Sequence, residues 1–97
     1  MRIVSLKRLI SFSATHADAK GPLDAWYHEI KHESWGSPTA IKARYPSADI
    51  LPGNRVVFNI KGNKYRLIVR INYAAGVVYI RFVGTHAEYD RIDAEQV

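Results

Sequence analysis

The residues best suited to chemistry lie in the second half of the chain, where three segments alternate between apolar and polar side chains. These segments, residues 55–61, 64–73 and 77–84, are rich in β-branched and aromatic residues, which predicts strands. Successive side chains of a strand point to opposite faces, so one almost wholly apolar set must face the core. The opposite set contains no acidic residue and consists of Asn59, Lys61, Arg66, Arg70, Asn72, Tyr79 and Arg81.

Such a set favours a surface that binds a polyanion. The connections between the three segments are short, so the strands are expected to be antiparallel neighbours and to project this set from one face. Guanidinium groups grip phosphate in a fork, and Tyr79 could stack on a base. The plain alternative is the solvated face of a half-buried sheet. A solvated face normally mixes charges of both signs, which favours the anion-binding interpretation.

Overall charge and composition agree with a polyanionic ligand. The chain carries 14 basic and 9 acidic residues, a formal charge of +5, and such a balance attracts polyanions. There is no cysteine, which excludes disulfides, thiolate metal sites and cysteine nucleophiles. No glycine-rich nucleotide loop or GxSxG motif is present.

A basic surface of this kind can cut RNA without a metal ion when the ribose 2′-hydroxyl attacks the adjacent phosphate. The protein must then accept a proton, stabilise the phosphorane charge and protonate the leaving oxygen. Arginine suits the charge role, and histidine suits either proton role. His86 and Tyr89 directly follow the third strand and would be neighbours on a helical turn. Either residue could equally be structural, His86 as a cap and Tyr89 as a core aromatic.

A metal site is disfavoured. His28 and His32 have the i, i+4 spacing of a helical zinc pair, but an isolated HxxxH is weak and no HExxH motif is present.

The first half of the chain has helical spacing. A short strand is expected at residues 2–4, followed by a helix over about residues 6–15. Ser5 is its candidate N-cap, and its apolar stripe comprises Leu6, Leu9, Ile10 and Phe12.

A second helix begins near Pro22 and is stopped by Gly36 and Pro38. Its apolar stripe comprises Leu23, Trp26, Tyr27 and Ile30. A short third helix runs from a cap at Ser37 through Ala43, and residues 47–54 have turn chemistry. Thr85 resembles the cap of a final short helix or turn.

Together these patterns predict one α+β domain over residues 1–97. It should contain a small antiparallel sheet of three to four strands, with two to three N-terminal helices packed on one face. Lys7 and Arg8 interrupt the first apolar stretch, unlike a signal peptide, and no apolar run approaches membrane-spanning length. We therefore expect a cytoplasmic protein with no membrane association.

Two C-terminal motifs resemble the HigB branch of the RelE-like toxins. That branch pairs an F-N-x-x-G-N-x-x-R segment with a later I-R-x-x-x-T-H-x-E-Y-D segment. The first motif is matched here by Phe58, Asn59, Gly62, Asn63 and Arg66. The second is matched by Ile80, Arg81, Thr85, His86, Glu88, Tyr89 and Asp90. The N-terminal half is similar more loosely, through helix order, Trp35 and residues 41–46.

The resemblance implies a compact RelE-like fold and a toxin that cleaves mRNA on the ribosome without a cofactor. It also implies neutralisation by a HigA-type helix-turn-helix antitoxin. At the matching positions, Arg66 and Arg81 would contact the phosphate, while His86 or Tyr89 would move protons. The further residues expected to contact RNA are Asn59, Lys61, Asn63, Lys64, Arg70 and Tyr79. Of these, only Asn59 and Asn63 match the motif, and Lys61, Arg70 and Tyr79 are expected from strand alternation.

Three other functions use the same basic face. A non-catalytic RNA-binding module would lose only affinity when His86 or Tyr89 is replaced. A protein-interaction domain would dock an acidic partner and ignore RNA. A gyrase-inhibiting toxin of the related ParE branch would arrest growth while mRNA stays intact, because a shared fold does not fix function.

Overall fold

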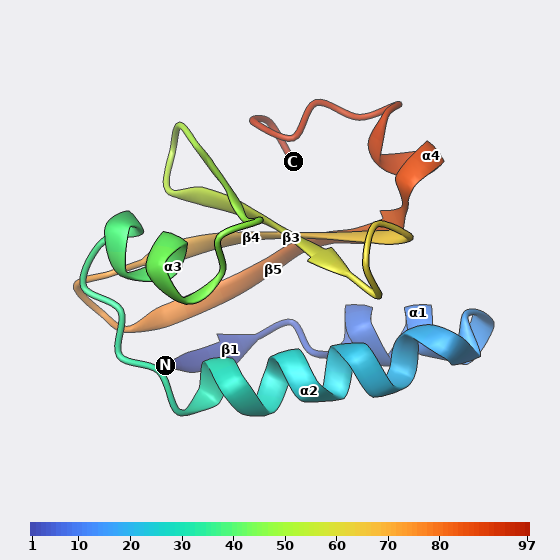
Figure 1. The fold of residues 1–97 in the computed structure, drawn as a ribbon, viewed down its shortest axis with the longest axis horizontal. Coiled ribbons are helices and arrows are strands. Elements are labelled where there is room, and N and C mark those ends of the chain that lie inside the picture. The colour runs from blue at the N-terminus through green and yellow to red at the C-terminus, as the bar shows by residue number, and fades with distance from the viewer.

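The computed structural model describes the whole chain, residues 1–97, as a sheet with helices (Figure 1). The elements in chain order are β1 (Arg2–Val4), α1 (Lys7–Thr15), a 3-10 turn η1 (Ala17–Ala19), α2 (Lys20–Lys31), α3 (Pro38–Arg44), β2 (Asp49–Leu51), β3 (Arg55–Ile60), β4 (Tyr65–Asn72), β5 (Val77–Thr85) and α4 (His86–Tyr89). None of these helices is long and apolar enough to cross a membrane.

The sheet has five strands in the order β1-β5-β4-β3-β2. The α+β class and the antiparallel β3–β4–β5 meander are confirmed. The sheet is larger than the three to four strands expected, and it is mixed, because β1 pairs with β5 in parallel. Strand β2 lies in a segment predicted to be a turn. A strand of three residues between turn-forming residues is too short to show an alternation of apolar and polar side chains, so β2 could not be predicted from the sequence.

Helices α1 and α2 cover one face of the sheet, as Figure 1 shows below the strands. The predicted stripe of α2 is confirmed: Leu23, Trp26 and Ile30 are buried against the core, at the spacing of one helix face. Helix α3 follows Ser37 as expected and contributes the buried Ile41. The helical layer thus leaves the opposite face of the sheet for other contacts.

Three details of the helices differ from the prediction. Ser5 is not a cap: it has a φ of +70°, and α1 begins at Lys7 without a side-chain cap. Ile10 is 70% exposed rather than part of the apolar stripe, because Leu6, Leu9 and Phe12 take the positions against the core. Helix α2 ends at Lys31, before Gly36.

A β-bulge in β5 reverses the side chains that follow it. Ile80 lies opposite Val69, but Phe82 lies opposite Ile68, so Arg81 is an extra residue between them. One inserted residue moves every later side chain to the other face. Simple alternation along residues 77–84 predicts that Phe82 faces the core with Val78 and Ile80, and that Val83 faces away with Tyr79 and Arg81. This prediction is wrong because of the bulge, and Val83 packs against the core instead.

The face opposite α1 and α2 has an apolar row across its middle. Val57, Ile68 and Phe82 are aligned across β3, β4 and β5. Val57 and Ile68 are only 1% and 0% exposed, although they are not part of the main core. The C-terminal segment runs over this side of the sheet (Figure 1), and the Arg55 Nε donates a hydrogen bond to the Val97 carbonyl at 2.9 Å. The face is thereby divided into two ends.

Candidate functional site

The α4 end of this face centres on Arg66. Its Nη1 donates to the Asn63 carbonyl at 3.1 Å, and its guanidinium carbon lies 5.6 Å from the centre of the Tyr89 ring. This is within cation–π range. Asn59 is the direct neighbour of Arg66 across β3 and β4, and its amide donates to the Ser47 carbonyl at 3.4 Å. The guanidinium group is thus held in place before any ligand arrives.

Helix α4 is fixed beside the start of β4 by a capping box. The Glu88 N–H donates to the Thr85 hydroxyl at 3.1 Å, and the Thr85 N–H donates to the Glu88 carboxylate at 2.8 Å. The second bond lowers the pKa of Glu88 below its ordinary value. The His86 N–H adds a bond to the Lys64 carbonyl at 3.1 Å. The predicted cap at Thr85 is confirmed. It starts α4 with His86 next to the first turn of β4 and brings Tyr89 to the corner occupied by Arg66.

His86 has a carboxylate partner that was not predicted from the sequence. Its Nδ1 lies 3.1 Å from a carboxylate oxygen of Asp90, one helical turn later. When Nδ1 carries the proton and donates it to Asp90, Nε2 keeps a free lone pair. The i, i+4 spacing of His86 and Asp90 was the available signal. The pair is more than 40% exposed at both side chains, so solvent and a ligand can reach it.

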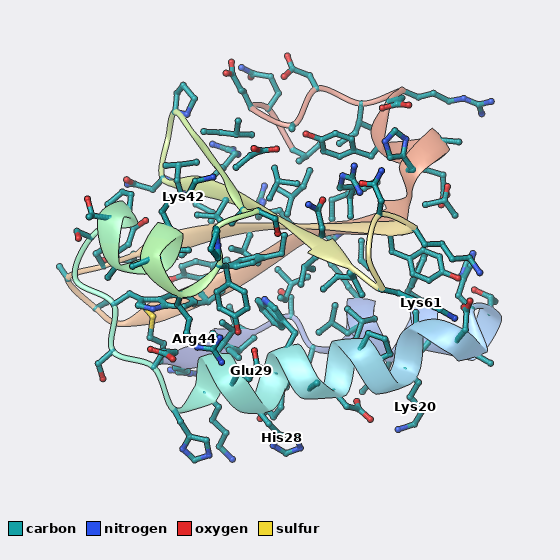
Figure 2. All side chains as sticks on the ribbon, viewed as in Figure 1. Lys20, His28, Glu29, Lys42, Arg44 and Lys61 are labelled. Atoms are coloured by element: carbon teal, nitrogen blue, oxygen red, sulfur yellow. The ribbon has the colours of Figure 1, made fainter.

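Lys61 and Lys64 do not join Arg66 on the sheet face. Both ammonium groups bind the carboxylate of Asp18 in η1, Lys61 at 3.0 Å, and the buried Tyr65 hydroxyl donates to the same carboxylate. Lys64, Tyr65 and Lys61 together hold the pKa of Asp18 well below its usual range. Figure 2 shows Lys61 at the β3–β4 turn, beside the helical layer.

The prediction that Lys61 shares the exposed face with Arg66 is wrong because strand alternation ends before it. Strand β3 stops at Ile60, and Lys61 takes a φ of +52° in the turn. Asp18, 43 residues earlier, was not predicted as its partner.

The opposite end of the face, at the β4–β5 turn, contains an open depression, which we name the Arg70 depression. Arg70, Tyr79 and Arg81 converge here, so the structure groups Arg81 with Arg70 rather than with Arg66. The complete lining is Asn54, Arg70, Ile71, Asn72, Tyr73, Ala74, Tyr79 and Arg81.

Comparison with known proteins agrees with this architecture. The family model of the HigB toxins, described as the RelE-like toxic component of a toxin–antitoxin system, matches residues 19–92. The chain belongs to the HigB family.

Curated HigB relatives resemble the chain over nearly its whole length. The mRNA interferase toxin HigB of Escherichia coli K12 is 30% identical over 92 residues, covering 93% of this chain and 88% of that protein. The mRNA interferase HigB of Shigella flexneri matches to the same extent. The mRNA interferase HigB of Escherichia coli O6:H1 is 26% identical over 72 residues, covering 72% of this chain and 70% of that protein.

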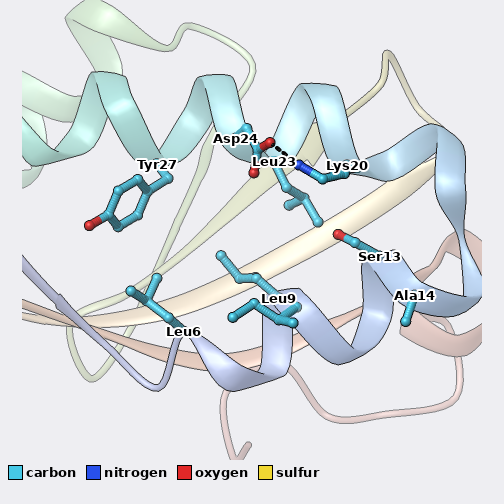
Figure 3. Close-up of a pocket in the computed structure, with 9 residues that line it drawn as sticks. Leu6, Leu9, Ser13, Ala14, Lys20, Leu23, Asp24 and Tyr27 are labelled. Carbon is cyan, nitrogen blue, oxygen red and sulfur yellow. Dashed lines mark hydrogen bonds and ion pairs between the residues drawn. The ribbon is translucent and has the colours of Figure 1, made fainter.

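The helical layer of this HigB-family chain carries a second hollow, of different character. A mostly apolar groove lies between α1 and α2, with Leu9, Leu23 and Tyr27 in its lining and the Lys20–Asp24 ion pair at one side (Figure 3). None of the predicted site residues lines it. Lys20 is the only cation in its lining, so the groove has no cluster of cations that could bind a phosphate.

The helical histidines are not gathered into a site. His28 points away from the sheet in Figure 2 and is exposed, as is His32. No group of three or more His, Asp or Glu side chains is arranged to hold a metal ion.

Proposed function

We propose that this HigB-family toxin is an mRNA interferase that cuts RNA at the α4 end of its sheet. Its HigB relatives from Escherichia coli K12 and Shigella flexneri carry that activity in their names. Two observations support the site: the held guanidinium of Arg66 over Tyr89, and the His86–Asp90 pair on the same short helix as Tyr89. This combination supplies fixed positive charge next to two groups that can move protons.

The proposed reaction is an internal transesterification. The 2′-oxygen of the ribose attacks the adjacent phosphorus while the bond from phosphorus to the 5′-oxygen breaks. The products are a 2′,3′-cyclic phosphate and a 5′-hydroxyl. Arg66 stabilises the extra negative charge of the phosphorane. The proton leaves the 2′-hydroxyl for one group, and the 5′-oxygen receives a proton from another.

His86 is the better-placed general base of the two candidates. The Asp90 carboxylate, 3.1 Å from Nδ1, favours the tautomer with its proton on Nδ1, which leaves Nε2 as the lone pair that takes the 2′-hydroxyl proton. Tyr89 then serves as the proton donor to the leaving oxygen, because a phenolic hydroxyl carries a proton to give. The contact with Arg66 fixes the Tyr89 ring.

Further residues would contact RNA beyond the phosphate that is cut. Asn59 is next to Arg66 and can reach the nucleotide that Arg66 holds, while Asn63 shapes the turn whose carbonyl positions Arg66. We retain Arg81 as a phosphate ligand, but for a neighbouring phosphate, because it lines the Arg70 depression. Lys61 and Lys64 contact RNA only when they leave Asp18.

The partners follow from the family. A toxin of this family has an antitoxin partner. We propose that the antitoxin is of the helix-turn-helix HigA type and that cutting takes place on ribosomes in the cytoplasm. Ribosomes would hold the mRNA single-stranded and extended beside the α4 end.

The test is to express the chain inducibly in a bacterial host and to map mRNA 5′ ends. New cuts within translated regions should appear with the wild type, persist in Lys7→Ala and disappear in Arg66→Ala. Lys7 is an exposed cation at the start of α1, on the helical layer, and serves as the control.

The other outcomes separate the alternatives. Growth arrest with intact mRNA would favour the gyrase-inhibiting branch. Folded protein that causes neither arrest nor cuts contradicts the toxin function for this chain. Cuts that persist in Arg66→Ala contradict the proposed site.

A further inference from the structure

The Arg70 depression has the composition of a nucleotide site. Its lining includes two guanidinium groups, two side-chain amides and an exposed aromatic ring, but no carboxylate. Tyr79 is 39% exposed, one of the few large apolar side chains that solvent reaches. Arg70 and Arg81 are also exposed, and none of the ion pairs in the structure includes either. These two cations are free to bind an anion.

The fold brings these side chains together in a specific way. Arg70 is the direct neighbour of Tyr79 across β4 and β5. Arg81 is the extra residue of the bulge, and bulges commonly re-aim a side chain at a functional surface.

We propose that the Arg70 depression is a second RNA subsite that holds one nucleotide of a single strand. Arg70 and Arg81 bind its phosphate and Tyr79 stacks on its base. The Asn54 amide and the Asn72 amide nitrogen reach the base edge, while the Asn72 amide oxygen accepts from the Ala75 N–H at 3.0 Å. Guanidinium forks match phosphate, and aromatic rings accept any base. The combination of fork, ring and amides fits a nucleotide better than a simple anion.

This subsite is distinct from the place of cutting. Arg66 and Arg70 are four residues apart on β4, so their Cα atoms are about 13 Å apart at the usual strand rise. The apolar row of Val57, Ile68 and Phe82 crosses the face between them. The two arginines therefore contact different phosphates. This inference rests on the proposed function, because the nucleotide bound here belongs to the RNA strand that is cut at the α4 end.

The test measures binding separately from cutting. The probe is a single-stranded RNA of about ten nucleotides with every 2′-hydroxyl methylated, which cannot undergo the transesterification. Binding to the full chain is followed by fluorescence anisotropy across salt concentrations. Arg70→Ala/Arg81→Ala should reduce the slope of log affinity against log salt by about 0.7 for each phosphate that the variant no longer binds.

Replacing the aromatic ring should give a different signature. Tyr79→Ala should weaken binding about 5- to 100-fold with little change in the salt slope, because stacking releases no counterion. Tyr79→Phe keeps the ring and should bind almost as the wild type does. Lys7→Ala is the control for general charge, and thermal melting confirms that each variant is folded.

A second arm, binding to vacant ribosomes, identifies the source of the nucleotide. Loss of affinity for the probe assigns the subsite to the transcript. Wild-type affinity for the probe with weakened ribosome binding assigns the same subsite to ribosomal RNA. Wild-type affinity in both arms would overturn the proposal. So would a probe affinity that Lys7→Ala reduces as much, or an acidic peptide that binds the depression when RNA does not.

These outcomes are separable from failure of the cutting activity. If the variants lose RNA affinity but the wild type never cuts RNA, the subsite stands and the interferase function falls. If the wild type cuts RNA but the depression variants bind RNA normally, the interferase function stands and the subsite falls.

Discussion

The two ends of the sheet face carry similar residue types but differ in how those residues are held. At the α4 end, Arg66 lies between the Asn63 carbonyl and the Tyr89 ring, and His86 is paired with Asp90. The nearby Lys61 and Lys64 are both bound to the carboxylate of Asp18. Every cation named at this end thus has a partner within the protein.

At the Arg70 depression, the corresponding groups are free. Arg70, Arg81 and Tyr79 are exposed, and no carboxylate lies among the lining residues. An arrangement held before the ligand arrives favours transition-state stabilisation, because no reorganisation is needed during the reaction. Exposed, unpaired arginines instead contribute affinity and salt dependence. This difference supports the proposal that cutting takes place at one end and RNA binding at the other.

The largest expected effect comes from removing the held guanidinium. Arg66→Ala should lower kcat for RNA cleavage by about 10²- to 10³-fold, the usual decrease on removal of a group that stabilises transition-state charge. The rate is measured at saturating mRNA, with and without ribosomes. Arg91→Ala, which removes an exposed arginine of the C-terminal segment, is the matched control and should leave kcat unchanged. An equal decrease in both variants would point to general charge instead.

The His86–Asp90 pair gives the next effect. Asp90→Asn should lower kcat about tenfold. Proton transfer as a whole contributes about 10²- to 10⁴-fold, and this change impairs only the orientation of the His86 ring. In a His86→Ala background the same change should have no further effect, because coupled residues are not additive. Additive decreases would show that Asp90 does not act through His86.

A smaller effect should follow from freeing the paired lysines. Asp18→Asn removes the charge that binds Lys61 and Lys64 but retains a side-chain oxygen for the Tyr65 hydroxyl. The variant should bind single-stranded RNA a few-fold more tightly, with a salt slope steeper by up to about 1.4 for two additional phosphates bound. An unchanged slope would mean that the lysines do not reach RNA once released.

The smallest effect is on stability at low pH. The bound Lys64, Tyr65 and Lys61 groups lower the pKa of Asp18 in the folded chain, so its stabilisation is complete above the unfolded value of about 3.9. That contribution should disappear as the pH falls below about 4 towards the depressed folded pKa. Urea unfolding of wild type and Asp18→Asn at pH 7, 4 and 3 measures it. A wild-type advantage that stays constant over this range contradicts the pairing.

Much of the fold could be predicted from local spacing. The apolar stripe of α2, formed by Leu23, Trp26 and Ile30, and the alternation along β3 and β4 were both predicted correctly. Each pattern depends only on which side of a single helix or strand faces the core. The cap at Thr85 is also local, with its partner three residues away. The family motifs lie in these same local segments.

The remainder depends on contacts between distant residues. The bulge at Arg81 shows only in the pairing of β4 with β5, so alternation alone placed Phe82 and Val83 on the wrong faces. Asp18 and Lys61 are 43 residues apart. Val57 and Ile68 are buried on the face over which the C-terminal segment runs (Figure 1). A single sequence gives no signal for such pairings, which is why one continuous basic face was expected where the structure has two ends.

The most direct test of this division measures both ends in one assay. Single-turnover cleavage of one mRNA would be followed across RNA concentrations for Arg66→Ala and for Arg70→Ala/Arg81→Ala. We predict that Arg66→Ala retains the wild-type half-saturating concentration but has a much lower maximal rate. The double variant should retain the maximal rate and need more RNA to reach it. The same pattern of impairment in both variants would contradict the assignment of cutting and binding to separate ends.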